Sequence, residues 1–186
     1  KLGDALPLYL ITVIGLSLIL MMLVFRSIAV PVIASLGFLL TVFATLGATV
    51  AVFQWGWLGQ LFDIHDPAPI LSFLPTILIG ILFGLAMDYQ VFLVTRMREE
   101  YVHGASAKEA VTIGFNHGAR VVSAAAVIMI SVFGAFMLSS ETTSKMMGFG
   151  LAAAVFFDAF IIRMIVIPAV MSILGDSAWK LPAWLD

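Results

Sequence analysis

The stretch PAPILSFLPTILIGILFGLAMDYQVFLVTRMREEY, residues 67–101, contains 21 uncharged residues, then an aspartate and a tyrosine, and finally a charged segment. A helix that crosses the hydrocarbon core of a bilayer needs about 20 predominantly apolar residues. The stretch therefore predicts a membrane-spanning helix with Asp88 and Tyr89 in its apolar part. Arg96 follows Asp88 by eight residues, about 12 Å along a helix, so the aspartate lies inside a hydrocarbon core about 30 Å thick.

The composition of the whole chain supports a membrane protein. Of its 186 residues, 62% are hydrophobic and only 11% are charged, whereas soluble domains are about 45–50% apolar. The net charge of -2 shows no basic excess, which argues against a nucleic-acid partner. The chain has no cysteine, which excludes a disulfide framework and a thiolate metal site.

Further uncharged runs at residues 5–25, 27–62 and 121–140 are each long enough to span a bilayer. A fifth segment qualifies if Asp158 and Arg163 are tolerated within it. We therefore predict an all-α, polytopic membrane helix bundle that forms a single transmembrane domain over residues 1–186. Its five spanning helices are expected near residues 7–25, 28–53, 69–95, 119–140 and 146–174.

The loop after the third span contains a helix start signal. Ser106 and Glu109 form an S-x-x-E capping box. The pattern predicts a short amphipathic helix near residues 106–116 that lies on the cytoplasmic membrane surface. Gly118 is expected to break this helix before the fourth span.

Basic residues indicate how the chain is oriented, because lysine and arginine favour the cytoplasmic side. With five spans, six basic residues fall on one side and two on the other. The N-terminus is therefore expected outside and the C-terminus in the cytoplasm. The six are Arg26, Arg96, Arg98, Lys108, Arg120 and Lys180, and the two are Lys1 and Lys145.

Small residues lead up to the aspartate in the third span. Gly80, Gly84 and Asp88 are spaced by four, so they share one helix face. A G-x-x-x-G pair lets another helix approach closely, so Asp88 is expected to face a neighbouring helix rather than lipid. Tyr89 lies on the adjacent face, and Phe92, one turn later, could cover the pair. We interpret Asp88 and Tyr89 as a proton-handling site, since ionisable residues within membrane spans usually serve function.

The last span repeats the pattern of small residues before a carboxylate, and Arg163 follows Asp158 by five residues. On a straight α-helix these two residues point about 140° apart, so they are expected to be poor partners. A contact between Asp88 and Arg163 is one hypothesis. A structural role is the alternative, because buried ions in helix bundles can simply pair and fix packing. Ser131 lies on a partly polar stripe of the fourth span that could face the same cluster.

No metal or cofactor site is expected from the sequence. His65 lies between Asp63 and Asp66 in the outer loop, but one histidine and two carboxylates in a flexible loop favour a solvated segment over a metal site. The nucleotide-binding pattern G-x-x-x-x-G-K-[ST] does not occur in the sequence, so ATP is not the implied energy source.

Three stretches resemble a known family. GLAMDYQVFLVTRMREEY, residues 84–101, strongly resembles the signature of the MmpL (mycobacterial membrane protein large) transporters, which belong to the resistance-nodulation-division (RND) superfamily of proton-driven exporters. FFDAFIIRMIVIPAVMSILG, residues 156–175, and WKLPAWLD, residues 179–186, resemble the family's last span and the segment after it. The resemblance covers essentially the whole chain.

The resemblance implies a larger architecture with twelve spans in two similar halves. The five helices would then be spans eight to twelve, and the chain, which does not begin with methionine, is expected to be a piece of a longer protein. Asp88 and Tyr89 match the tenth-span pair that relays protons together with a second Asp-Tyr pair in the N-terminal half, which this chain lacks. Phe92 matches the aromatic residue that covers the pair. Gln90 stands where the family often has an acid, and we expect it to lie off the relay face.

The implied function is export of lipids or other hydrophobic molecules across the bacterial cytoplasmic membrane, driven by the proton-motive force and without enzymatic chemistry. This chain would supply half of the proton relay. One alternative is a non-transporting sterol- or lipid-sensing scaffold of related architecture. Another is an intramembrane hydrolase with Ser131 or Ser139 as nucleophile, but no spanning histidine or lysine offers a base, and the G-x-S-x-G pattern does not occur.

Overall fold

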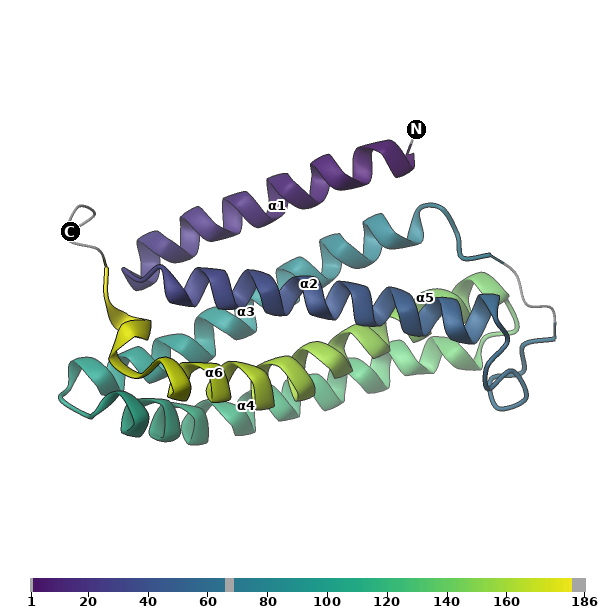
Figure 1. The fold of residues 1–186 in the computed structure, drawn as a ribbon. Coiled ribbons are helices and arrows are strands. Elements are labelled where there is room, and N and C mark those ends of the chain that lie inside the picture. Colours follow the sequence, from purple (N-terminus) through teal and green to yellow (C-terminus); the bar gives the residue numbers. More distant parts are fainter. Residues whose placement is uncertain (1, 66–68, 182–186) are drawn as a thin grey trace.

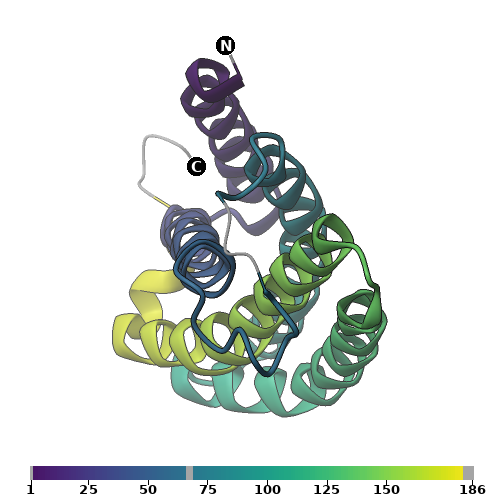
Figure 2. The same ribbon diagram turned by 90° about the vertical axis from the view of Figure 1, so that its right-hand side faces the viewer.

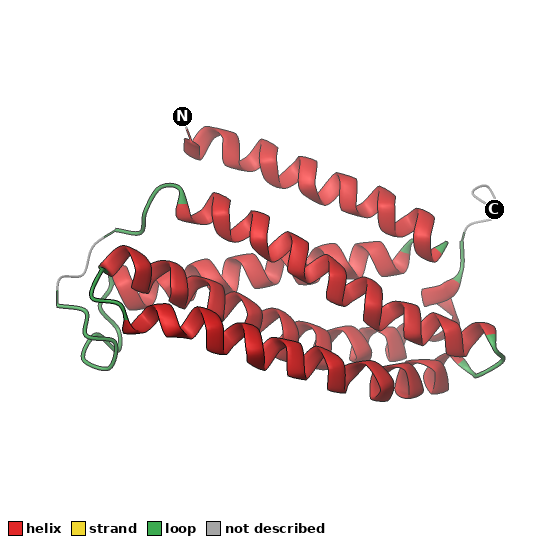
Figure 3. Cartoon of the chain, turned by 180° about the vertical axis from the view of Figure 1, so that it is seen from behind, coloured by secondary structure: helices red, strands yellow, loops and turns green. Residues whose placement is uncertain are grey.

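The computed structural model describes residues 2–65 and 69–181, with side chains from residue 3 onward, and every regular element in this part is helical (Figure 3). Five helices are long and apolar enough to cross a membrane, which confirms the prediction of an all-α membrane bundle. That residues 1–186 form a single transmembrane domain stays a prediction. Lys1, Asp66 and the end of the WKLPAWLD stretch lie outside the described residues.

The spans correspond to six α-helices and four short π- or 3₁₀-helices. The first and third spans are each one α-helix, and the other three continue into π- or 3₁₀-helical segments. In chain order the elements are α1 (Leu2–Phe25), α2 (Ala29–Thr49), η1 (Val50–Gln54), α3 (Leu74–Val102), α4 (Ala107–Ala135), η2 (Phe136–Leu138), α5 (Thr142–Phe156), η3 (Phe157–Val166), α6 (Ile167–Leu174) and η4 (Gly175–Trp179).

The helices run side by side along the bundle, so the turns gather at its two ends (Figure 1). One end carries the α1–α2 turn, the α3–α4 turn and η4, and the other carries the α2–α3 loop and the α4–α5 turn. Viewed along its axis, the bundle has α1 at one edge (Figure 2). α1 packs on α2 and α3 through Leu6, Tyr9 and Val13, and much of its remaining surface is exposed.

The closest packing in the bundle joins α3 to α4. A Cβ atom on Gly114 would lie 2.5 Å from the Cα of Met97, and one on Gly118 would lie 2.7 Å from the side chain of Leu93. These two glycines form a G-x-x-x-G pair that lets the helices approach one another. Sequence reasoning singled out the glycine pair of α3 and missed this one, although the four-residue spacing is the same.

The expected break at Gly118 is wrong, because α4 continues through it to Ala135. The helix tolerates this glycine because the absent side chain makes room for Leu93. Consequently the amphipathic helix expected near residues 106–116 is the first part of a single long helix. Its start is as expected, since the hydroxyl of Ser106 accepts a hydrogen bond from the backbone N–H of Glu109 and the carboxylate of Glu109 accepts one from the backbone N–H of Ser106.

The third span also differs at both ends from the expected residues 69–95. α3 begins at Leu74 with Pro75 in its first turn, where a missing N–H is tolerated. It continues to Val102 because arginine, methionine and glutamate are good helix formers, although their charges end the apolar run.

Candidate functional site

Asp88 lies at the midpoint of α3, about 21 Å from either end at 1.5 Å per residue. Its side chain is exposed, on a stripe spaced by three or four residues that no described helix covers. Among residues 2–65 and 69–181, no hydrogen bond or ion pair involves the Asp88 carboxylate. The exposed stripe consists of Ile81, Gly84, Asp88, Val91 and Thr95.

The surface beside Asp88 is an open groove, which Phe92 lines together with Asp88. Arg96 and Glu99 extend the groove toward the end of α3, with 3.4 Å between Nη1 of Arg96 and Oε2 of Glu99. The guanidinium carbon of Arg96 lies 5.6 Å from the centre of the Phe92 ring. Phe92 therefore lies beside Asp88 in this groove, and it also packs against the apolar cluster between α4 and the last span. That it covers the pair of Asp88 and Tyr89 stays a prediction.

The two glycines of α3 have different surroundings. A Cβ atom on Gly80 would lie 2.9 Å from the hydroxyl of Tyr9, so α1 approaches closely there. At Gly84 the space around a Cβ position is empty to 4 Å. Within the described residues, close helix approach therefore occurs at Gly80, and the Gly84–Asp88 part of the face is uncovered.

Asp158 and Arg163 form a buried ion pair in η3, with exposed fractions of 2% and 1%. Nε of Arg163 donates to Oδ2 of Asp158 at 2.9 Å, and Nη2 donates to Oδ1 at 3.3 Å. Nη1 of Arg163 donates to Oε1 of Gln90 on α3, whose exposed fraction is 1%. This two-bonded arrangement is the strong geometry for arginine and carboxylate, and it links the last span to α3.

The expectation that Asp158 and Arg163 are poor partners is wrong, because η3 is a π-helix. Its hydrogen bonds join residues five apart, so residues i and i+5 lie one turn apart on the same face. Pro168 is the second residue after η3, and its missing N–H interrupts the α-helical hydrogen-bond ladder. Since Arg163 is occupied by Asp158 and Gln90, the hypothesised contact between Asp88 and Arg163 is not formed.

Gln90 is the residue of this cluster whose role sequence reasoning missed. It lies away from the Asp88 face, as expected, but it is buried and holds Arg163. A signal was present in the sequence: Leu82, Ala86, Leu93 and Met97 recur at helical spacing and are buried, and Gln90 is the polar member of that series.

Tyr89 stands in the chain between Asp88, on the open face, and Gln90, in the buried cluster with Asp158 and Arg163. It is partly buried and close enough to interact electrostatically with Asp88, Asp158 and Arg163. Ser131 does not join them, because it is exposed and its hydroxyl donates to the carbonyl of Val127 in its own helix at 2.8 Å.

The α2–α3 loop is attached to the last span through Lys145. This side chain is buried, and its ammonium group donates to the carbonyl oxygens of Phe62 and Asp63 at 3.2 and 3.1 Å. His65 lies 3.4 Å from the carboxylate of Asp63, and both side chains are largely exposed.

Together these features define a polytopic α-helical membrane protein with ionisable residues deep within its spans. The sequence profile of the MMPL family matches residues 4–184. The chain therefore belongs to the MMPL family, which confirms the resemblance to the MmpL transporters.

Three relatives show how far the similarity extends. The chain is 50% identical over its whole length to the membrane protein YdfJ of Bacillus subtilis, covering 26% of that protein. It is 39% identical over its whole length to the trehalose monomycolate exporter MmpL3 of Mycolicibacterium smegmatis, covering 18% of it. It is 35% identical over 97% of its length to the mycolic acid-containing lipids exporter MmpL11 of the same organism, covering 19%. The chain thus spans between about a fifth and a quarter of the length of these relatives.

Proposed function

We propose that this chain is part of an exporter that moves lipids or other hydrophobic molecules across the bacterial cytoplasmic membrane and uses the proton-motive force. The observation that carries the proposal is the exposed Asp88 carboxylate at the midpoint of a spanning helix. A charged aspartate at the centre of a bilayer costs about 2.5–3.5 kcal/mol on insertion scales. A chain that places such a group on an open face needs other polar groups or water to cover it.

The covering partner in this proposal is the N-terminal half of the same transporter, which carries a matching Asp-Tyr pair. Gly84 offers the space for a helix of that half, one turn before Asp88. Asp88 takes up a proton on the outer side of the membrane, becomes neutral, and releases the proton to the cytoplasmic side. The neighbouring hydroxyl of Tyr89 donates to the charged carboxylate and passes the proton onward.

The buried ion pair has a supporting role in this mechanism. Asp158 and Gln90 together accept one hydrogen bond from each guanidinium nitrogen of Arg163, which holds α3 against the last span. This arrangement positions Tyr89 and Asp88 but leaves the relay itself to the open face of α3.

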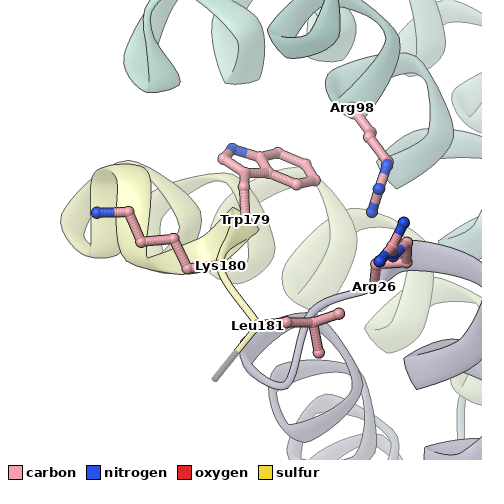
Figure 4. A pocket seen from close by; sticks show the side chains of 5 residues that line it. All are labelled: Arg26, Arg98, Trp179, Lys180 and Leu181. Carbon is pink, nitrogen blue, oxygen red and sulfur yellow. The ribbon is translucent and has the colours of Figure 1, made fainter. Parts of the chain in front are cut away.

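The orientation follows from the charges at the two ends of the bundle. Arg26, Arg98 and Lys180 all lie at the end with the α1–α2 turn (Figure 4), and basic residues favour the cytoplasm. The N-terminus is then outside and the C-terminus is cytoplasmic. A proton that enters across 100 mV supplies about 2.3 kcal/mol. The printed names of the MmpL3 and MmpL11 relatives as lipid exporters support the substrate class.

The test is lipid export from right-side-out vesicles that contain the protein at its full natural length. Vesicle lipids are radiolabelled, unlabelled acceptor liposomes collect the exported lipid, and a pH gradient is imposed and then collapsed with an ionophore. We expect Asp88→Asn to abolish gradient-driven export, because an amide side chain cannot take up and release a proton as a carboxylate does.

The matched control is Asp176→Asn, which removes an exposed carboxylate in η4 at the end of the last span. It should export at the rate of the unaltered protein. Export by Asp88→Asn at the normal rate would refute the relay. A chain that exports nothing in any form but still senses sterols or lipids would be the non-transporting scaffold instead.

A further inference from the structure

The last span carries an apolar groove on the side that faces away from α3. On its buried side α5 touches α3, where a Cβ atom on Gly150 would lie 3.2 Å from the side chain of Leu78. The opposite side of α5, which lies between α2 and α4 (Figure 2), lines an open groove of about 520 Å³ whose surface is almost wholly apolar. Small residues make it hollow, namely Ala152 and Ala153 on α5, Ala48 on α2 and Gly134 on α4.

The length of the groove matches one leaflet of a bilayer. It begins beside Lys145 at the end of the bundle with the α2–α3 loop and ends at Phe157. These residues are about 18 Å apart at 1.5 Å per residue, and half of a hydrocarbon core is about 15 Å thick. The last span continues beyond the groove to Trp179. A spanning helix would need a groove along the whole span, so the length favours an acyl chain that enters from one leaflet.

The mouth of the groove is polar. A second open cavity of about 680 Å³ adjoins the apolar groove, because Phe62 and Met137 line both. The ammonium group of Lys145 lies at this mouth and donates to the carbonyl oxygens of Phe62 and Asp63 and, at 3.5 Å, to Oδ2 of Asp63. These three acceptors use all of its donors. Asp63 thus neutralises this lysine, which therefore does not favour an anionic headgroup.

Hydroxyl and carboxylate groups at the mouth are available to a ligand. The hydroxyl of Ser139 accepts a hydrogen bond from the backbone N–H of Glu141 at 3.2 Å, so its own hydrogen can be donated. The hydroxyl of Ser140 is exposed and has no hydrogen bond among the described residues. The side chain of Asp63 is 76% exposed and can accept. Such donors and acceptors suit a headgroup that carries hydroxyl groups and no net charge.

We propose that this groove binds one acyl chain of a lipid whose headgroup is uncharged and carries hydroxyl groups. The acyl chain lies along α5 between α2 and α4, and the headgroup lies at the mouth beside Asp63, Ser139 and Ser140. The lipid comes from the leaflet at the end with the α2–α3 loop. Only the statement that this is the outer leaflet rests on the proposed function, through the orientation given there.

The test measures binding of 1-palmitoylglycerol to the full-length protein by native mass spectrometry. An amine-oxide detergent is used because its headgroup has no hydroxyl group. Gly134→Leu places a side chain in the groove, where the space around the Cβ is empty to 4 Å, and should weaken binding by at least about tenfold. Gly15→Leu is the matched control, because it adds the same side chain to an equally empty position on α1. It should bind the lipid as the unaltered protein does.

The headgroup contact has its own pair of variants. Ser140→Ala removes a hydroxyl at the mouth and should weaken binding of 1-palmitoylglycerol by about threefold, the usual effect of one neutral hydrogen bond. Ser140→Thr keeps the hydroxyl and should bind normally. The anionic lipid 1-palmitoyl lysophosphatidylglycerol has the same acyl chain and should bind at least about tenfold more weakly than 1-palmitoylglycerol.

The possible outcomes separate the parts of the proposal. Equal binding by Gly134→Leu and Gly15→Leu would overturn the groove, and if Gly134→Leu does not fold, Ala153→Ile fills the same groove from α5 and decides. Equal or tighter binding of the anionic lipid would overturn the uncharged headgroup. An unaltered protein that binds no 1-palmitoylglycerol, because another part of the full-length chain fills the groove, would overturn the site. The assay uses no pH gradient, so a failure of the proton relay at Asp88 would not change its result.

Discussion

Asp88 and Asp158 are both aspartates deep within spanning helices, and their surroundings are opposite. Asp158 is 2% exposed, with Arg163 bound to both of its oxygen atoms. Asp88 is exposed and has no charged or hydrogen-bonded partner among the described residues. The first carboxylate is neutralised within the chain. The Asp88 carboxylate can still accept hydrogen bonds from groups outside the described residues.

The comparison shows that depth in the membrane does not by itself identify a proton carrier. A carboxylate that is ion-paired with a buried arginine contributes to packing, whereas a carboxylate on an uncovered helix face can exchange protons. The following predictions test this difference with the protein at its full natural length.

Removal of the arginine should have the largest effect on stability. Arg163→Met leaves the Asp158 carboxylate buried without compensation, so the free energy of unfolding should fall by about 3–5 kcal/mol. The double variant Asp158→Leu with Arg163→Met removes both charges and should recover most of the loss, because an apolar pair can replace a buried ion pair. Denaturant unfolding in detergent measures both. A double variant as unstable as the single one would contradict the pairing.

Loss of the third member of the buried cluster should have a smaller effect. Gln90→Leu leaves Nη1 of Arg163 without an acceptor, so the free energy of unfolding should fall by about 1–3 kcal/mol. Gln60→Leu, at an exposed position in the α2–α3 loop, is the control and should leave the midpoint of the same unfolding curve unchanged. If both variants behave alike, Gln90 does not hold the arginine.

Gly84 tests whether another helix covers the open face. Gly84→Leu should lower the free energy of unfolding by about 1–3 kcal/mol, because a covering helix would have to move away. Gly134→Leu on α4 introduces the same side chain where the space around a Cβ is also empty, and it should have little effect. Equal tolerance at both positions would mean that the Asp88 face meets only lipid.

Asp88 itself should matter least for stability. Asp88→Asn removes no hydrogen bond or ion pair that the described residues form, so the free energy of unfolding should change by about 0.5 kcal/mol or less. The same substitution at Asp158 breaks the buried pair and serves as the contrasting variant. Thermal unfolding of the two variants side by side measures the difference. A large loss at Asp88 would assign it a structural role after all.

Much of the fold was predictable, because apolar runs about 20 residues long are a strong signal for spanning helices. The start of α4 was also predictable, since the Ser106–Glu109 box is a local pattern. The π-helix of η3 and the packing at Gly118 were not. Pro168 and the four-residue spacing of Gly114 and Gly118 are local signals, but neither says which residues of a neighbouring helix will be contacted.

The sequence by itself determined the class of this protein, its five spans, its family and the position of Asp88 at the centre of a helix. Those properties depend on hydrophobicity, spacing and motif, which are local. Only the tertiary structure decided that Asp158 pairs with Arg163, that Gln90 completes the pair and that Asp88 is left open. Pairing depends on which side chains share a helix face and which neighbour that face meets. A π-helical segment places residues i and i+5 on one face, which an α-helix of the same sequence would not do.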